Sequence, residues 1–376
     1  MSRVFRFCYA FAHKNPVLVI AFFAALVTSF FIPPDAEYLS YFDLKTLSCL
    51  FTVLAVVGAL RNIRFFDALA HRIVHICHSV RICALCIVYI TFLGSMLIAN
   101  DMALLTFLPL GYMVLTVTHE EKHMAPLFIL QNIAANLGGM LTPFGNPQNL
   151  YLYSHFEIPN LEFLSIMAPS FLLSMALFTG ACFIFFPHDR MELPEEYDPL
   201  PPARTALYLL LFALSVVMVF RVIPYYIGLA VIFVVLLFAD RKALLHVDYP
   251  LLFIFVFFFI FAGNMSRIGA VRNLLSNLLA VNTLWISTLS CQIISNVPSA
   301  ILLSQFTDNY KELLIGVNIG GTGTLIASLA SLITFRQYRR HNPGKTGHYL
   351  LLFSAFNFTF LIVLLLFNTL LLHLQG

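Results

Sequence analysis

The chain has 376 residues, of which 60% are hydrophobic and only 10% are charged, and its mean hydropathy is +0.89. Soluble domains carry about a quarter charged residues, so a chain this apolar needs lipid around it. The net charge of +3 is too small to indicate nucleic-acid binding, and seven scattered cysteines fit buried, reduced thiols better than disulfides. The composition predicts an all-α polytopic membrane protein.

Apolar runs of about 17–25 residues, long enough to cross a bilayer, follow one another along the chain. The first run lacks a small-residue cleavage site, so we expect a retained span and not a signal peptide. With broken spans and hairpins included, we expect about nine to eleven spans. The predicted spans lie near 16–32, 44–60, 125–155, 160–186, 205–220, 225–239, 250–263, 311–335 and 348–374.

Two further apolar stretches have polar residues at their centres, which a continuous span would not tolerate. The first covers 82–118 and turns at Asn100-Asp101. The second covers 283–306 and turns at 295–298. We expect both stretches to be re-entrant hairpins that return to the side from which they enter.

The most informative segments, 132–149 and 318–331, place glycine, amides and hydroxyls inside apolar runs. Unpaired backbone groups in hydrocarbon cost several kcal/mol, so irregular backbone survives at membrane depth only around protein or a wet cavity. Placing Asn136 on Asn318 superimposes the two segments without a gap. This repeat alignment also pairs Gly138 with Gly320, Gly139 with Gly321, Thr142 with Thr324, Gly145 with Ala327, Asn146 with Ser328 and Asn149 with Ser331. Two matching broken helices are typical of a transporter binding site.

These patterns divide the chain into five parts. An N-terminal scaffold span (1–43) precedes a first repeat (44–186), a proline-rich cytoplasmic linker (187–204) and two scaffold spans (205–249). A second, inverted repeat with the C-terminal span covers 250–376. In each repeat an amphipathic segment follows the first span, at 61–80 and at 264–281.

The distribution of basic residues predicts how the chain lies in the membrane. Cytoplasmic loops attract Lys and Arg. With a cytoplasmic N-terminus, 16 of the 21 basic residues fall inside, and the remaining five are Lys45, Arg221, Arg267, Arg272 and Lys311. We therefore expect a multi-pass protein of the cell inner membrane, whose first hairpin opens to the inside and whose second opens to the outside.

The hairpin tips and the breaks bring together groups suited to ions. Asparagine and threonine offer oxygens to a sodium ion and donors to an oxyanion. Exposed helix N-termini favour anions, and unwound carbonyls favour cations. In the first repeat Asn100 and Asp101 are expected to face Thr142, Gly145, Asn146 and Asn149. In the second repeat Ser295 and Asn296 are expected to face Gly321, Thr322, Thr324 and Ser328.

Asp101 is the carboxylate that this arrangement places inside a hairpin. Ionisable residues within a membrane are functional by default, so Asp101 is expected to coordinate a cation or carry a proton. The alternative is that it caps the descending helix, and the two roles are compatible.

The motifs at 141–150, 98–101 and 294–299 resemble those of the ion transporter superfamily. That group includes citrate-transporter-like permeases, divalent-anion/sodium symporters, arsenite permeases and D-type sodium/proton antiporters. The similarity covers about 44–338 and implies homodimers in which hairpins and broken helices move as an elevator. Dicarboxylate symporters carry threonine after each tip asparagine. Here Asp101 and Val297 stand at those positions, and the Asn-Asp tip is more similar to the arsenite-permease and antiporter members.

The resemblance implies roles for individual residues. Asn100, Gly145, Asn296 and Ala327 match cation ligands, and Asn146 and Ser328 match substrate contacts. Together with the residue patterns, the predicted substrate-binding set is Asn100, Asp101, Thr142, Asn146, Asn296, Thr322, Thr324 and Ser328. The predicted cation-binding set is Asn100, Asp101, Gly145, Asn149, Ser295, Asn296 and Ala327.

We therefore expect a secondary carrier, and not an enzyme, for a small anion such as a di- or tricarboxylate or an inorganic oxyanion. Coupling to Na⁺ or H⁺ is expected, without another cofactor, because no nucleotide-binding glycine loop is present in the sequence. The alternatives are a cation/proton antiporter or an arsenite efflux permease. A channel is separated poorly from a carrier by sequence.

Two other patterns suggest metal chemistry. His119-Glu-Glu-Lys-His123 matches the zinc-protease pattern, although it lies in a charged loop before Pro126. A solvated loop is the preferred interpretation, so no zinc is expected. His71, His75 and His78 share a helical face near Cys83 and Cys86, and an interfacial helix explains that face better than a metal or arsenite site.

Overall fold

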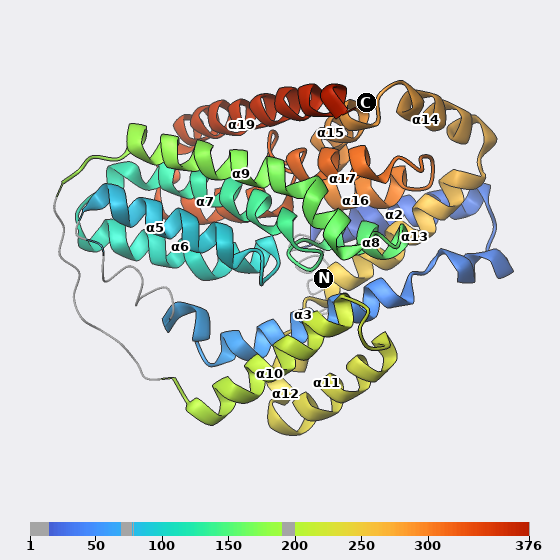
Figure 1. Ribbon diagram of the computed structural model, residues 1–376, viewed down its shortest axis with the longest axis horizontal. Coiled ribbons are helices and arrows are strands. Elements are labelled where there is room, and N and C mark those ends of the chain that lie inside the picture. The colour runs from blue at the N-terminus through green and yellow to red at the C-terminus, as the bar shows by residue number, and fades with distance from the viewer. Residues whose placement is uncertain (1–14, 69–76, 78, 190–199, 376) are drawn as a thin grey trace, which may run out of the picture.

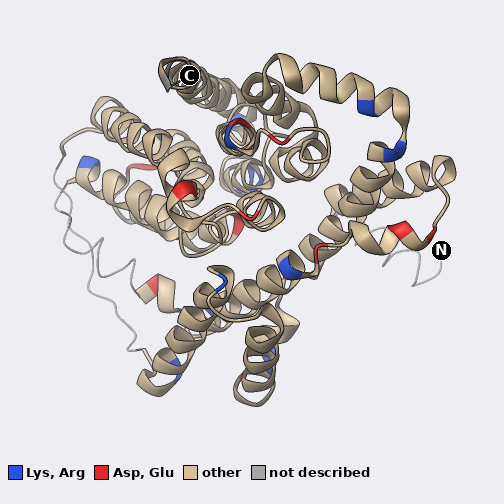
Figure 2. Cartoon of the chain, turned by 45° about the vertical axis from the view of Figure 1, so that its right-hand side comes forward, with Lys and Arg blue, Asp and Glu red and all other residues tan. Residues whose placement is uncertain are grey.

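The computed structural model describes residues 15–68, 77, 79–189 and 200–375 (Figure 1). Within these residues every regular element is helical, as the sequence predicts. Six of the described helices are long and apolar enough to cross a membrane, and four shorter apolar helices accompany them. The protein is thus an all-helical polytopic membrane protein. Charged residues are sparse along its helices (Figure 2).

The two halves of the chain repeat one order of elements: a long helix, a helical hairpin, a broken helix and a second long helix. The first half contains α3 (Leu44–Asn62), the hairpin α5 (Val80–Gly94) and α6 (Asn100–Val117), the broken helix α7 (Met124–Gly138), η3 (Gly139–Leu141) and α8 (Pro147–His155), and then α9 (Asn160–Phe185). The second half contains α13 (Tyr249–Arg267), α14 (Gly269–Val281), the hairpin α15 (Thr283–Ile294) and α16 (Asn296–Leu303), the broken helix α17 (Tyr310–Ile319) and α18 (Leu329–His341), and α19 (Thr346–Gln375). The remaining elements are α2 (Pro16–Phe31), η1 (Ala36–Tyr41), η2 (Glu121–His123), α10 (Pro202–Val219), α11 (Tyr225–Ala239), α12 (Arg241–Leu245) and η4 (Pro343–Lys345).

The helices form two groups. The scaffold group consists of α2, α3 and α10–α13: α3 packs on α10, α11 and α12, and α2 packs on α13. The central group consists of α5–α9 and α15–α19. Figure 1 shows α3 and α10–α12 below the central group. The groups touch where α13 meets α16 and α3 meets α8.

The two repeats interlock inside the central group. Each hairpin packs on the broken helix of its own repeat, α5 and α6 on α7, and α15 and α16 on α17. Each descending arm also packs on the second half of the other broken helix, α6 on α18 and α16 on α8. Helices of both repeats therefore pack around the breaks, and Ile326 of the second break is 57% exposed.

Burial separates the broken helix from the ordinary spans. The most apolar window of the span at Glu121–Leu141 is 89% buried, against 28% for the window of α9 and of α10. Exposed apolar side chains such as Phe31 and Phe238 lie on peripheral helices, where lipid is expected. A helix that ends mid-bilayer survives where protein surrounds it, and the burial of this span meets that condition.

Several element boundaries differ from those predicted. The amphipathic segment expected from Asn264 begins later, because α13 continues to Arg267 before α14 starts. Asn264 is fully buried there, and its amide nitrogen finds partners in Thr28 Oγ1 and Ser29 Oγ of α2, both at 3.3 Å. The helix α10 begins at Pro202, inside the predicted linker, because proline is favoured in a first helical turn.

Some predicted features lie outside the described residues. These are the linker residues 190–199 and residues 69–76 and 78 of the first amphipathic segment, which include His71, His75 and His78.

Candidate functional site

Four helix N-termini converge at the centre of the protein. Asn100 and Asn296 are the first residues of α6 and α16, the descending arms of the hairpins. Asn146 and Ser328 are the N-caps of α8 and α18, the second halves of the broken helices. Helix N-termini carry partial positive charge and free N–H groups, so their convergence favours an anion.

A small cavity of about 40 Å³ lies between the two hairpin tips. Its lining from the central group is Asn100, Asp101, Pro147, Ser295, Asn296, Val297, Pro298, Ser328 and Leu329. Its remaining wall is apolar and comes from the scaffold group: Val17 of α2, and Leu251 and Ile254 of α13. The cavity therefore lies at the boundary between the two groups.

Asn136, near the end of α7, joins the first hairpin to the second break. Its Oδ1 accepts a hydrogen bond from Asn100 Nδ2 at 3.0 Å and one from Ser328 Oγ at 2.7 Å. All three residues are at most 4% exposed. One amide oxygen thus holds elements from both halves of the chain together.

Asn318, the partner of Asn136 in the repeat alignment, makes the corresponding contacts with the first break. Its Nδ2 donates to Asn149 Oδ1 at 2.6 Å. Its Oδ1 accepts from Asn146 Nδ2 at 3.4 Å and from Gln148 Nε2 at 3.5 Å. The two equivalent asparagines therefore each bridge from their own broken helix to the opposite repeat.

The two break threonines fasten each hairpin to its own broken helix. Thr142 Oγ1 donates to the Met96 carbonyl at 2.7 Å, and Thr324 Oγ1 donates to the Gln292 carbonyl at 3.0 Å. Met96 and Gln292 each lie four residues before the tip asparagine of their hairpin. The same tie therefore occurs in both repeats.

The second tip is held in a strained backbone conformation. Ser295 has a φ of +76°, which is rare for a residue with a side chain and costs of order 1–3 kcal/mol. The Ala327 carbonyl of the break accepts from Asn296 N at 2.9 Å and from Ser295 Oγ at 3.2 Å. These bonds offset the strain and close the tip onto the break.

Several buried oxygens at the site have no hydrogen-bond donor among the described residues. Asp101 Oδ1, Asn146 Oδ1 and Gln148 Oε1 are of this kind. Asp101 is the second residue of α6, directly after the tip asparagine. Buried acceptors without donors are costly in an empty site, and a cation, a proton or a hydroxyl group supplies what they lack.

The predicted residues divide into two shells. Asn100, Asp101, Ser295, Asn296 and Ser328 line the cavity. Asn146 is buried beside them, 3.1 Å from the Asn136 carbonyl that accepts from its Nδ2. Thr142, Thr322, Thr324, Gly145, Asn149 and Ala327 are not among the lining residues. Thr322 Oγ1, for example, donates to the Ile319 carbonyl at 2.6 Å.

Sequence reasoning did not assign Asn136, Asn318 or Gln292 to the site. The pairing of Asn136 with Asn318 in the repeat alignment was the signal available for the first two. Gln292 has Met96 at the matching position of the first hairpin, so no repeat pattern marks it.

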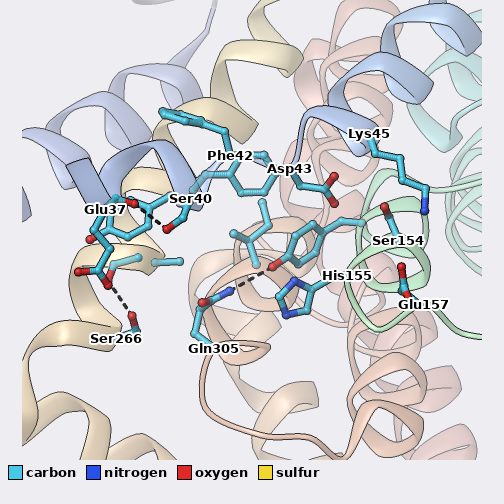
Figure 3. A pocket seen from close by; sticks show the side chains of 16 residues that line it. Glu37, Ser40, Phe42, Asp43, Lys45, Ser154, His155, Glu157, Ser266 and Gln305 are labelled. Carbon is cyan, nitrogen blue, oxygen red and sulfur yellow. Dashed lines mark hydrogen bonds between the residues drawn. The ribbon is translucent and has the colours of Figure 1, made fainter. Parts of the chain in front are cut away.

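A larger cavity of about 460 Å³, the vestibule, lies on the face predicted to be outside. Figure 3 shows the side chains that line it. Its lining includes Glu37, Asp43, Lys45, Ser154, His155, Glu157 and Gln305. The helices α8, α13 and α16 line both cavities. Tyr151, Ile301 and Phe259 of the vestibule follow Pro147, Pro298 and Ile254 of the small cavity by three to five residues, about one helical turn.

Tyr151 lines the vestibule one helical turn after Pro147 of the small cavity. Its ring packs on Phe259, with centroids 5.6 Å apart, and its hydroxyl lies 2.8 Å from Ser304 Oγ. Gln305 Nε2 donates to the same hydroxyl at 3.3 Å. The tyrosine is thus fixed at the inner end of the vestibule.

The zinc-protease interpretation finds no support in the described residues. No group of three His, Cys, Asp or Glu side chains in that part of the chain is placed to hold a metal ion. His123 Nε2 and Lys122 Nζ lie 3.5 and 3.0 Å from Glu120 Oε2, so the charged loop pairs with itself.

The fold and the central site define a membrane transporter. A citrate transporter family profile matches residues 9–310. The chain therefore belongs to the citrate transporter family.

Three relatives are also transporters or membrane proteins. The chain is 32% identical to an uncharacterized transporter of Methanocaldococcus jannaschii over 85% of this chain and 88% of that protein. It is 30% identical to inner membrane protein YbiR of Escherichia coli over 82% of this chain and 84% of that protein. A silicon efflux transporter of Oryza sativa subsp. japonica is 33% identical over 39% of this chain and 30% of its own length.

Proposed function

We propose that the protein is a secondary active carrier that moves a small anion, a carboxylate or an inorganic oxyanion, coupled to Na⁺ or H⁺. The observation that carries the proposal is the convergence of four helix N-termini on a cavity between the hairpin tips. Oriented N–H groups attract an anion without a basic side chain, and the described residues that line the cavity include no Lys, Arg or His.

An elevator mechanism is supported by where the cavity lies. One wall, from α2 and α13, is apolar, and every polar lining residue belongs to the central group. A rigid movement of the central group against that apolar wall would carry the solute and its ligands together. The vestibule would then be the route by which the solute enters from outside. The carrier itself would lie in an inner membrane as a homodimer.

Asp101 is the proposed coupling residue, because its Oδ1 is buried without a donor beside the cavity. We expect Asp101→Asn to abolish or uncouple ion-driven uptake into proteoliposomes while the protein still folds. The control is Asp308→Asn, which changes an exposed carboxylate in a loop. Coupled uptake by Asp101→Asn at the rate of the control would refute the assignment.

A second candidate function is cation/proton exchange without an anion. The donor-free oxygens of Asp101, Asn146 and Gln148 favour it, since such oxygens attract a cation as readily as a proton. An imposed sodium gradient that moves protons in the absence of any anion would select exchange over anion transport.

Melting temperatures measured with different ligands can narrow the range of candidate solutes. A ligand that binds only the folded protein raises the melting temperature by mass action. Carboxylates, sulfate, arsenite and silicic acid, each with and without sodium, form the test set. Silicic acid is included because one relative is a silicon efflux transporter.

A further inference from the structure

At each break, one amide nitrogen lies within hydrogen-bond distance of three backbone carbonyls. In the first break the Gly139, Met140 and Thr142 carbonyls surround Asn149 Nδ2 at 3.0, 3.3 and 3.4 Å. At the second, the Gly320 and Thr322 carbonyls of the break lie 2.9 and 3.0 Å from Gln292 Nε2. The third carbonyl, from Thr288 one turn earlier in α15 itself, lies at 3.2 Å. Met140 and Thr322 are equivalent in the repeat alignment.

Three acceptors around one amide nitrogen exceed its hydrogens. A primary amide has two N–H groups, so it can satisfy two of the three carbonyls with straight hydrogen bonds. Several oxygens converging on one point is instead how unwound carbonyls coordinate a cation in transporters. Each nitrogen thus occupies a place with the surroundings of a small cation.

The orientation of both amides is fixed by their oxygens. Gln292 Oε1 accepts from the backbone nitrogen of Thr324 at 2.8 Å, and a backbone N–H is always a donor. Asn149 Oδ1 accepts from Asn318 Nδ2 at 2.6 Å. Flipping either amide would set its oxygen against three carbonyl oxygens, so the nitrogens must face the carbonyls.

The backbone makes room for Gln292. Gly323 has a φ of +114°, and a Cβ at that position would overlap Gln292 Oε1. This close approach requires glycine, both for the positive φ and for the space. The position of the amide is therefore built into the second break.

We propose that Asn149 and Gln292 are resident cation substitutes, whose amide nitrogens occupy the carbonyl clusters of the two breaks and exclude sodium from them. This assignment deepens the proposed function. The occupation of the carbonyl clusters stands without that function, and only the consequence for ion coupling rests on it. Asn149, predicted above as a cation ligand, is instead the group that takes the place of the cation. The buried carboxylate of Asp101 is then the group through which a coupling ion acts.

The test replaces each of the two amide nitrogens by an oxygen that can bind a cation. Asn149→Asp and Gln292→Glu replace the amide nitrogen by a carboxylate oxygen, which repels the three carbonyls unless a cation lies between them. We expect both purified variants to gain a saturable rise of melting temperature in NaCl over N-methylglucamine chloride at equal ionic strength. The rise should be several-fold larger than in the wild type. Asn149→Ser and Gln292→Ser, which leave a gap and a hydroxyl, serve if a carboxylate variant does not fold.

The matched control is Asn132→Asp. Asn132 is fully buried in the same core, but its Nδ2 donates to the Ser331 hydroxyl at 3.2 Å. A purely structural role predicts that all these variants lose stability equally in both salts, and that result would overturn the proposal. A wild-type sodium response that Gln292→Glu abolishes would also overturn it. Because sodium binding is measured without solute, the result is independent of whether anion uptake is found.

Discussion

Replacing Asn136 by alanine tests whether one amide oxygen holds the site together. The substitution removes the acceptor of Asn100 Nδ2 and of Ser328 Oγ, which are 4% and 1% exposed. Each buried donor left without a partner costs about 1–3 kcal/mol, so we expect a loss of about 2–6 kcal/mol of unfolding free energy. The third bond of the side chain, to the Asn132 carbonyl, lies within its own helix and adds little.

The matched control is Asn357→Ala in α19. Asn357 is also fully buried, but its amide nitrogen donates only to the Phe353 carbonyl one turn away in the same helix. Its removal strands no donor from another element, so a loss of about 1 kcal/mol or less is expected.

The measurements are reversible unfolding in mixed micelles with increasing SDS, and initial uptake into proteoliposomes. Asn136→Ala should lower both, and Asn357→Ala should leave uptake near the wild-type rate. Equal unfolding free energies for the two variants would refute the role given to Asn136. So would normal uptake by Asn136→Ala, because the site would then form without this bridge.

The packing of α5 on α7 and the surface charge at η1 give two more predictions. Gly138→Ala should prevent α5 from packing on α7 and abolish uptake, because the new Cβ would overlap the Phe92 carbonyl. The control Gly180→Ala should be tolerated, since no atom lies within 4 Å of its new Cβ. A Gly138→Ala protein with wild-type melting temperature and uptake would contradict this. Arg267, bonded to Asp35 at 2.6 and 3.1 Å, holds the pKa of Asp35 below its ordinary value of 3.8. A carboxyl group whose pKa is lowered in the folded protein contributes stability that is present above pH 3.8 and is lost as the pH falls through the folded pKa. Amide exchange in η1, corrected for intrinsic rates, should therefore be constant from pH 7 to 5 and accelerate only below that range. Acceleration between pH 7 and 5 would assign the contact to another group.

The broken helices and hairpins were predictable because polar residues and helix breakers occur there in the middle of apolar stretches long enough to cross a membrane. Clusters of glycine, proline and asparagine mark the breaks, whereas single ones such as Pro169 and Asn357 lie inside continuous helices. The predicted turns at Asn100 and at 295–298 coincide with the starts of α6 and α16. The span predicted over 225–239 coincides with α11, since Pro224 and Asp240 bound its apolar run. Where such residues were misleading, as at Asn264 inside α13, the side chain is paired with α2, a contact that the sequence does not display.

The cavity-lining residues were predicted better than the residues behind them. Polar side chains in the middle of an apolar run are costly, so Asn100, Asp101 and Asn296 stood out. Gln292 lies within a helix and acquires its role from the distant carbonyls of Gly320 and Thr322. Roles that arise from contacts between distant segments follow from the tertiary structure and not from spacing.

The bridge between Asn136 and Ser328 also sets the order in which the protein can be completed. The two residues are 192 positions apart in the chain. Ribosomes add about 5–20 residues per second, so Asn136 waits about 10–40 s before Ser328 is synthesised. During that interval the first half of the chain contains a broken helix whose second binding partner does not yet exist. Until then, the insertion machinery or water must supply the missing hydrogen-bond partner of the Asn136 amide. Nascent chains arrested between the two positions should therefore be released from the insertion machinery only once α18 has emerged.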